Sequence, residues 1–179
     1  MSAAQVQRLR YRLISQGWTL PHFHSSENLR VIRDEFRRLV DSLENFFVTA
    51  CILRKRNVLS SEWDPACIYR DCLLQVVQAV LNSRERDVHK LILITDAPLP
   101  KSQLKPSIHS LRSELKSRAL PFHHYLERAL YEPNLQISDS IAWTIFQEME
   151  KGRKVDLPKL KSLGKLKLME FQVNDDHLG

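Results

Sequence analysis

Apolar residues recur along the chain with two different spacings. The longer spacing matches the period of an α-helix. Residues 2–15 and 29–44 each place their apolar side chains along one side of a helix. A third helix is expected to begin at Asp64-Pro65, because Asp caps helices and Pro favours their first position. Two further helices are expected, one at about 103–118 and one that ends at Gly152.

Three short stretches fit strands better than helices. They lie at about 46–54, 90–95 and 120–126, and the first two are continuous apolar runs typical of buried strands. Strands that alternate with helices indicate right-handed crossovers and a parallel sheet covered by helices. We therefore expect one α/β domain over 1–152, followed by a basic C-terminal tail over 153–179.

The overall composition is that of an ordinary globular protein. Apolar residues make up 43% of the chain and charged residues 27%. The four glycines disfavour a glycine-rich phosphate loop. The chain has no apolar run long enough to cross a bilayer, and its first residues are too polar for a signal peptide. These features lead us to expect a cytoplasmic protein with no membrane partner.

The cysteines and histidines do not form a zinc motif. Cys51, Cys67 and Cys72 include no C-x-x-C pair and lie in apolar stretches, which is typical of buried, reduced thiols. His22 and His24 form an H-x-H pair, but no second pair of ligands follows at zinc-like spacing. We therefore expect no structural zinc.

The net charge favours a polyanionic partner, above all nucleic acid. The formal charge is +6, and much of the excess lies in KGRKVDLPKLKSLGKLKLM near the C-terminus. The alternative is a solvated tail that docks through its leucines. The basic residues that we expect to contact nucleic acid are Arg54, Lys55, Arg56, Lys101, Arg153 and Lys154.

Two acidic side chains lie at positions that suggest a functional role. Asp96 follows the second predicted strand directly, and open α/β sheets bind ligands at such strand ends. Its alternative role is an Asx turn that leads into Pro98. Asp139 points toward the apolar side of the last helix, where a charge is costly unless it is compensated. Its alternative role is an ion pair with one of the many Lys or Arg side chains.

Considered together, these carboxylates predict a metal site. A carboxylate at a strand end and another on the last helix can meet at one divalent ion, and metal-dependent phosphodiester hydrolysis needs clustered carboxylates. Hard oxygen ligands suit Mg²⁺ or Mn²⁺ better than zinc. Gln136 lies one turn before Asp139, where it could hold a metal-bound water or a substrate phosphate.

Four segments then match one family in the right order. HFHSSENLRVIRDEF, CILRKRN, LILITDAPLPK and LQISDSIAW resemble motifs of the domain-of-unknown-function 3800 family, and the resemblance spans roughly residues 8–155. LQISDSIAW is the most specific of the four. The resemblance implies a ribonuclease-H-like fold and metal-dependent nuclease chemistry. It implies that Asp96 and Asp139 are metal ligands, with supporting roles for Gln136, Lys55, His24 and Glu27.

The chain departs from that family at its beginning. The family opens with a strand that carries F-x-D-E-S-G, and this chain has no such segment, so its fold is expected to be truncated at the N-terminus. The metal site then lacks a main carboxylate. The strand at 46–54 also becomes an apolar edge, which we expect another copy or a partner chain to cover. Two functions stay open: a metal-dependent nuclease domain, or a catalytically inactive nucleic-acid-binding or scaffolding module of the same fold.

Overall fold

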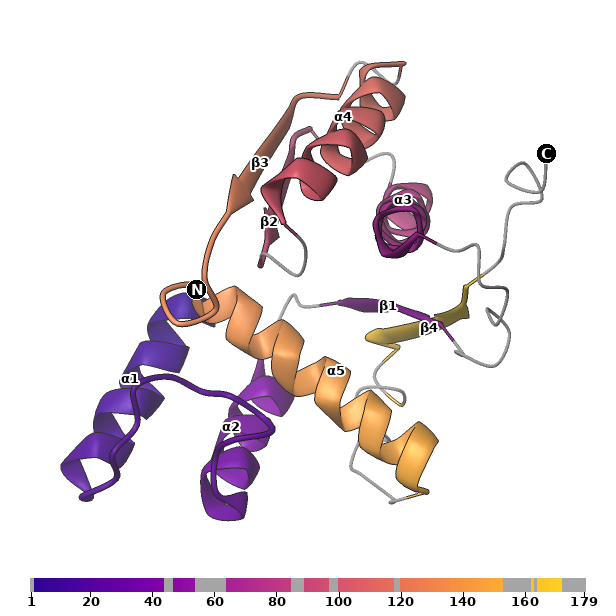
Figure 1. The fold of residues 1–179 in the computed structure, drawn as a ribbon. Coiled ribbons are helices and arrows are strands. Elements are labelled where there is room, and N and C mark those ends of the chain that lie inside the picture. Colours follow the sequence, from indigo (N-terminus) through magenta and orange to yellow (C-terminus); the bar gives the residue numbers. More distant parts are fainter. Residues whose placement is uncertain are drawn as a thin grey trace. The chain divides into compact units, whose positions relative to one another are not determined.

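The fold is a mixture of helices and short parallel strands (Figure 1). The computed structural model describes residues 2–43, 47–53, 64–84, 89–96, 100–117, 120–152, 162 and 164–171. The helices are α1 (Ser2–Ser15), α2 (Arg30–Ser42), α3 (Pro65–Arg84), α4 (Lys101–Ser117) and α5 (Pro133–Lys151). The strands are β1 (Val48–Ile52), β2 (Leu91–Thr95), β3 (Phe122–Leu126) and β4 (Leu166–Glu170).

Local sequence signals place most of these elements correctly. The predicted α/β class is confirmed, and the expected helices and strands are present within a few residues of their predicted bounds. At the start of α3, the Asp64 side chain accepts a hydrogen bond from the Ala66 N–H at 3.0 Å. The helix α5 ends at Gly152, whose φ of 59° is left-handed and therefore suits glycine. None of the described helices is long and apolar enough to span a bilayer.

The strands pair differently from the single sheet that we expected. The described strands form two two-stranded sheets, β1 with β4 and β2 with β3. In the first, β1 and β4 run parallel along their whole length, from Val48 opposite Leu166 to Ile52 opposite Glu170. In the second, hydrogen bonds join the start of β2 to the start of β3 and the ends to each other, so these strands are parallel too. The ribonuclease-H-like arrangement itself stays a prediction.

β4 is missing from our sequence prediction. It lies in the segment that we expected to be a basic tail, because lysines dominate the sequence around LKLME. The strand at 46–54 was expected to be an exposed edge that another chain covers. Instead, β4 of the same chain pairs with one edge of β1. A partner or a second copy is not required on that side, and the predicted boundary after residue 152 stays a prediction.

The chain divides into two compact units, and the division falls inside β2 and β3. Unit 1 comprises Met1–Phe47, Ile94–Asp96 and Tyr125–Lys165. Unit 2 comprises Val48–Leu93, Ala97–His124 and Leu166–Gly179.

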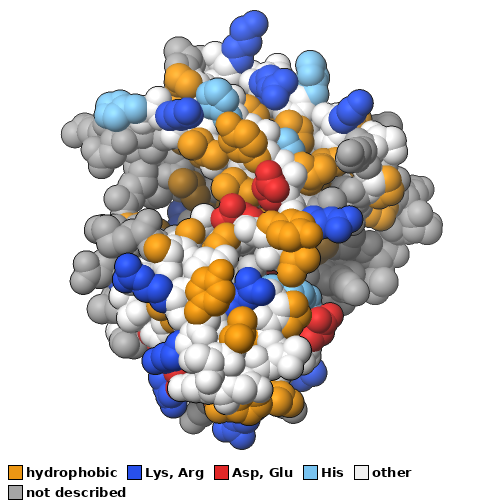
Figure 2. Space-filling model, turned by 90° about the vertical axis from the view of Figure 1, so that its left-hand side faces the viewer, with side chains coloured by type: hydrophobic (Ala, Val, Ile, Leu, Met, Phe, Trp, Pro, Cys, Tyr) orange, Lys and Arg blue, Asp and Glu red, His pale blue; other side chains and the backbone are white. Residues whose placement is uncertain are grey.

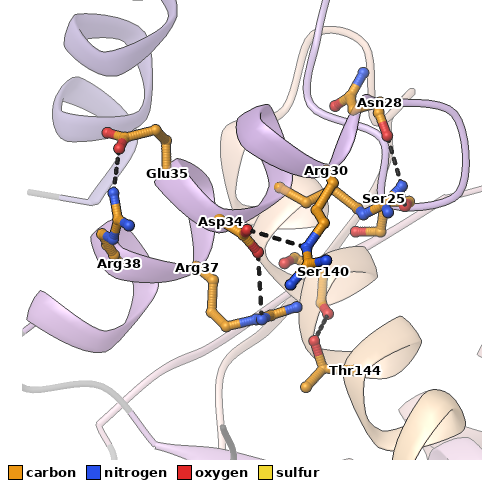
Figure 3. Close-up of polar contacts among 10 residues, drawn as sticks. Ser25, Asn28, Arg30, Asp34, Glu35, Arg37, Arg38, Ser140 and Thr144 are labelled. Atoms are coloured by element: carbon orange, nitrogen blue, oxygen red, sulfur yellow. Dashed lines mark hydrogen bonds and ion pairs between the residues drawn. The ribbon is translucent and has the colours of Figure 1, made fainter. Parts of the chain in front are cut away.

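The core of unit 1 lies between α1, α2 and α5 (Figure 1). Each helix contributes a buried apolar row, and Phe23 from the loop before α2 stacks on Phe36 at 4.1 Å between ring centroids. Along α2, Asp34 pairs with Arg30 and Arg37, and Glu35 pairs with Arg38 (Figure 3). Each pair has at least one exposed partner, and ion pairs near the surface add little stability. The buried apolar residues of the three helices are Val6, Leu9, Leu13, Ile32, Phe36, Val40, Ile137, Ile141 and Ile145.

The core of unit 2 is aliphatic. Val77 and Leu81 of α3 meet Leu111 and Leu115 of α4, and leucines of β2 pack against this cluster. The three cysteines are free and half-buried. Burial raises the pKa of the Cys72 thiol to about 12, and the neighbouring Cys51 thiol adds to the effect. Fully buried thiols were expected, so the cysteines are more accessible than predicted.

Candidate functional site

One pocket in unit 1 gathers several of the predicted site residues. Its volume is about 510 Å³. Asp96 reaches it from the end of β2, Asp139 from α5, and His24 from the loop before α2. The remaining lining residues are His22, Phe23, Arg128, Ala129, Leu130, Leu135, Ser138 and Ala142. Asp96 and Asp139 are 43 positions apart in the sequence (139 − 96), yet they line the same cavity.

The wall of this pocket is chemically mixed. Leu130, Leu135 and Ala142 make it apolar on some sides, whereas the acidic side chains and Arg128 make it polar on others. On the face of the molecule drawn in Figure 2, acidic side chains likewise lie among exposed hydrophobic side chains, with Lys, Arg and His side chains nearby. A cavity with apolar walls and a few polar groups is typical of a ligand site.

Asp139 is held by the loop before α2. Its Oδ2 accepts a hydrogen bond from the backbone N–H of Ser25 at 2.9 Å. Within the described part of the chain, this is the only hydrogen bond to the carboxylate, and no Lys or Arg pairs with it. The ion-pair alternative for Asp139 is therefore wrong for the described residues. One carboxylate oxygen is fixed, and the other has no hydrogen-bond donor among those residues.

Asp96 occupies the strand end that the sequence predicted. It is exposed, whereas the preceding Thr95 is buried. The Glu127 N–H donates to the Thr95 carbonyl at 3.0 Å, which holds the loop after β3 beside the end of β2. This loop brings Arg128 to the pocket. The Asx turn toward Pro98 falls on residues outside the described part of the chain.

The loop that carries His22 and His24 is closed by its own hydrogen bonds. The His24 N–H donates to Asn28 Oδ1 at 2.7 Å, and the Asn28 N–H donates to the His24 carbonyl at 2.9 Å. Arg33 donates to the Asn28 carbonyl at 2.6 Å and lies over the Trp143 ring at 4.9 Å. The loop is therefore tied to both α2 and α5.

Gln136 does not line the pocket but holds two of the loops that form it. Its side chain is buried, with a relative exposure of 3%. Its Oε1 accepts from the Phe23 N–H at 3.2 Å, and its Nε2 donates to the Ala129 carbonyl at 2.7 Å. Both ends of the amide are thus bonded to backbone. The geometry favours a positioning role for Gln136, and its predicted contact with a water or phosphate stays a prediction.

Among the charged or titratable residues of the pocket, Arg128 and His22 had no functional role in our sequence prediction. Arg128 is one of many arginines, and nothing in its local sequence separates it from the others. His22 was weighed only as part of a zinc motif. Its Nδ1 is buried and has no hydrogen-bond partner among the described residues, and its ring meets that of His24 edge-on at 5.8 Å. The fold brings both residues to the pocket, and no local sequence signal identified them.

The other predicted site residues lie elsewhere or outside the described part. Glu27 is exposed in the turn before α2 and does not line the pocket. Lys101 begins α4 in unit 2, and its side chain is not described. The residues that lie outside the described part of the chain are Arg54, Lys55, Arg56, Arg153 and Lys154.

The possible metal ligands of the pocket suit a magnesium ion better than a structural zinc ion. The described residues include no group of three or more His, Cys, Asp or Glu side chains that could hold an ion. Mg²⁺, however, is usually held by one or two carboxylates, and waters and substrate phosphates complete its shell. Asp96 and Asp139 supply two carboxylates.

Comparisons with known proteins add no relative. No family model, no curated protein and no solved structure matches the chain.

Proposed function

We propose that the pocket of unit 1 is the active site of a metal-dependent nuclease that hydrolyses phosphodiester bonds of nucleic acid. The observation that carries the proposal is that Asp96 and Asp139, far apart in the sequence, line one pocket with Arg128. The resemblance to the domain-of-unknown-function 3800 family, with its ribonuclease-H-like fold, points the same way. A net charge of +6 favours a polyanionic substrate.

Each residue has a role that follows from its position. Asp96 and Asp139 are the proposed ligands of Mg²⁺ or Mn²⁺, and such an ion, when bound, lowers the pKa of water and neutralises charge on a phosphate. The Ser25 N–H keeps the Asp139 carboxylate in one orientation. Arg128 supplies a cation to the same pocket, and a guanidinium suits a phosphate oxygen.

A second function is favoured by the small number of carboxylates. Two acids line the pocket, whereas two-metal hydrolysis uses more. A catalytically inactive module that binds nucleic acid would keep the basic charge and the pocket without turnover. Cleavage that depends on Asp139 separates this module from the nuclease.

The test is a cleavage assay with single-stranded and duplex DNA and RNA in Mg²⁺ or Mn²⁺. Asp139→Asn is the informative variant, because an amide oxygen can still accept the Ser25 N–H while the ligand charge is lost. We expect its rate to fall on the order of 100-fold or more. Asp34→Asn is the matched control, since Asp34 forms ion pairs on α2 away from the pocket. Equal rates in both variants would refute the nuclease.

A further inference from the structure

Positive charge gathers on α1 and α2, which pack side by side in unit 1 (Figure 1). α1 carries three arginines and no acidic residue. α2 carries four arginines against Asp34, Glu35 and Asp41. Seven arginines against three acids leave an excess of four positive charges, or of three when Glu27 in the loop between the helices is counted. The two helices therefore form a basic surface even after every acid on them is included.

Glu35 is shared by two arginines that come from different helices. Its Oε2 pairs with Arg12 of α1 at 2.7 Å, and its Oε1 pairs with Arg38 of α2. The side chains of Arg12 and Arg38 are 57% and 74% exposed, whereas that of Glu35 is 27% exposed. One carboxylate offsets only one guanidinium. This group of three thus keeps a positive charge, and its arginines are the members that face the solvent.

Asp34 is shared in the same way within α2. Its Oδ2 pairs with Arg30 at 3.7 Å, and its Oδ1 pairs with Arg37 at 3.6 Å (Figure 3). The side chain of Arg30 is 89% exposed and that of Asp34 is 38% exposed. This second group also keeps one positive charge. Both carboxylates orient guanidiniums in advance, so less conformational freedom is lost when a further anion binds.

We infer that an arginine surface on α1 and α2 binds the phosphates of a nucleic-acid duplex. Its members are the exposed arginines of the two helices, namely Arg8, Arg12, Arg30 and Arg38. Arg8 lies one turn before Arg12, so each helix presents its own row of guanidiniums. Packed helices lie about 8–10 Å apart, and the two strands of a duplex border grooves about 6 and 12 Å wide. Two rows of cations match two rows of phosphates, whereas a single strand offers one row.

The arginine surface and the pocket belong to the same unit. The loop that joins α1 to α2 carries His22 and His24 to the pocket. A duplex bound along the two helices is therefore held by the unit that contains the proposed cleavage site. The inference rests on the proposed function, because it takes the duplex as the substrate of that pocket.

The burial pattern of the two helices favours a duplex over an acidic membrane. A helix that lies on a membrane turns its apolar face toward the lipid. The apolar rows of α1 and α2 are instead buried in the core of unit 1. A duplex needs no apolar contact, since it carries one negative charge per about 1.7 Å of its axis and attracts arginines by charge alone.

The experiment is fluorescence anisotropy of a labelled mixed-sequence DNA duplex and of its single strand, at several salt concentrations and without divalent ions. The test variant is Arg30→Gln/Arg38→Gln, in which Asp34 and Glu35 each keep their other arginine. Loss of two phosphate contacts should lower the slope of log affinity against log salt by about two. Duplex affinity should fall about 10- to 100-fold at about 0.1 M salt. Arg30→Lys/Arg38→Lys retains both charges and should retain the slope.

The matched control removes two positive charges from another helix. Lys105→Gln/Lys116→Gln changes two exposed lysines of α4 in unit 2, so the net charge of the chain falls by the same amount. Its duplex affinity should change less than about threefold. An equal loss in the lysine and arginine variants would show that only the total charge matters, and it would overturn the arginine surface.

The remaining outcomes separate the arginine surface from the nuclease. The surface is overturned if the wild-type protein binds the single strand as tightly as the duplex, or binds phosphatidylserine vesicles and no duplex. If Arg30→Gln/Arg38→Gln keeps full affinity while Asp139→Asn loses cleavage, the surface is wrong and the nuclease stands. If the arginine variant loses affinity while the wild-type protein cleaves nothing, the surface stands and the nuclease fails. Circular dichroism of each variant confirms that the helices are folded.

Discussion

The two units have interiors of different chemical character. The core cluster of unit 2 is made of aliphatic side chains from α3 and α4, with Leu111 and Leu115 each only 1% exposed. In unit 1, α5 buries polar side chains between its isoleucines. These buried polar residues are Gln136, Ser140, Thr144 and Gln147. Burying polar groups is costly unless they are hydrogen-bonded, so hydrogen bonds must offset the cost of burying these side chains.

The two interiors differ because the helices of each unit hold a different kind of segment in place. Helices and paired strands satisfy their own backbone groups, whereas irregular loops need other partners. In unit 1, side chains of α5 bind loop backbone directly, through Gln136 to Phe23 and through Asp139 to Ser25. In unit 2, the contacts of α3 and α4 with each other and with β2 are mainly aliphatic, although the buried Ser107 hydroxyl donates to the Ala66 carbonyl. Gln136 and Asp139 of α5 therefore hold loops that form the pocket.

The largest effect is expected in the aliphatic cluster. Leu111→Ala removes a fully buried side chain and leaves a cavity, which typically lowers the free energy of unfolding by about 2–5 kcal/mol. Urea unfolding followed by circular dichroism measures this change. A loss below about 1 kcal/mol would mean that the cluster collapses around the cavity and is not tightly packed.

A smaller loss is expected at the polar support of unit 1. Gln136→Leu leaves the buried Phe23 N–H without its acceptor, which should lower the free energy of unfolding by about 1–3 kcal/mol. Thr144→Val is the matched control. Thr144 is also buried, but among the described residues its hydroxyl donates only to the Ser140 carbonyl one turn back in the same helix (Figure 3), so its loss should cost less. If the Leu variant is as stable as the control, α5 does not support the loop.

The smallest effect concerns the pH dependence of unit 2. Burial, and to a lesser degree the charge of Arg112, lower the pKa of His124 from its ordinary value of 6.5. Below that value the unfolded chain binds more protons than the folded one, so the free energy of unfolding decreases as the pH falls. His124→Gln should reduce this decrease. The check is the difference in melting temperature between pH 7.5 and 5.5 for both proteins, and an identical difference would contradict the assignment.

Much of the fold was visible in the sequence because it depends on local patterns. The spacing of apolar residues located the helices, and Asp64-Pro65 marked the start of α3. The pairing of β1 with β4 was not visible, because it joins residues more than a hundred positions apart and the lysines of LKLME obscure the strand. The pairing of strands that lie so far apart in the sequence is determined by the complete fold.

The candidate site was predicted in part for the same reason. Asp96 and Asp139 stood out because each is an acid where its element is apolar. The partner of Asp139 is a backbone N–H of Ser25, and any residue except proline offers that donor, so no sequence signal identifies it. The role of Gln136 was equally hidden, since a buried glutamine and a catalytic one have the same sequence context.

The most direct test is calorimetric titration of the purified chain with Mn²⁺. We predict that the wild-type protein binds Mn²⁺ and that Asp96→Asn and Asp139→Asn each weaken binding at least about tenfold, whereas Asp34→Asn binds like the wild type. Unchanged affinity in both pocket variants, or no binding by the wild-type protein, would contradict a metal site between Asp96 and Asp139.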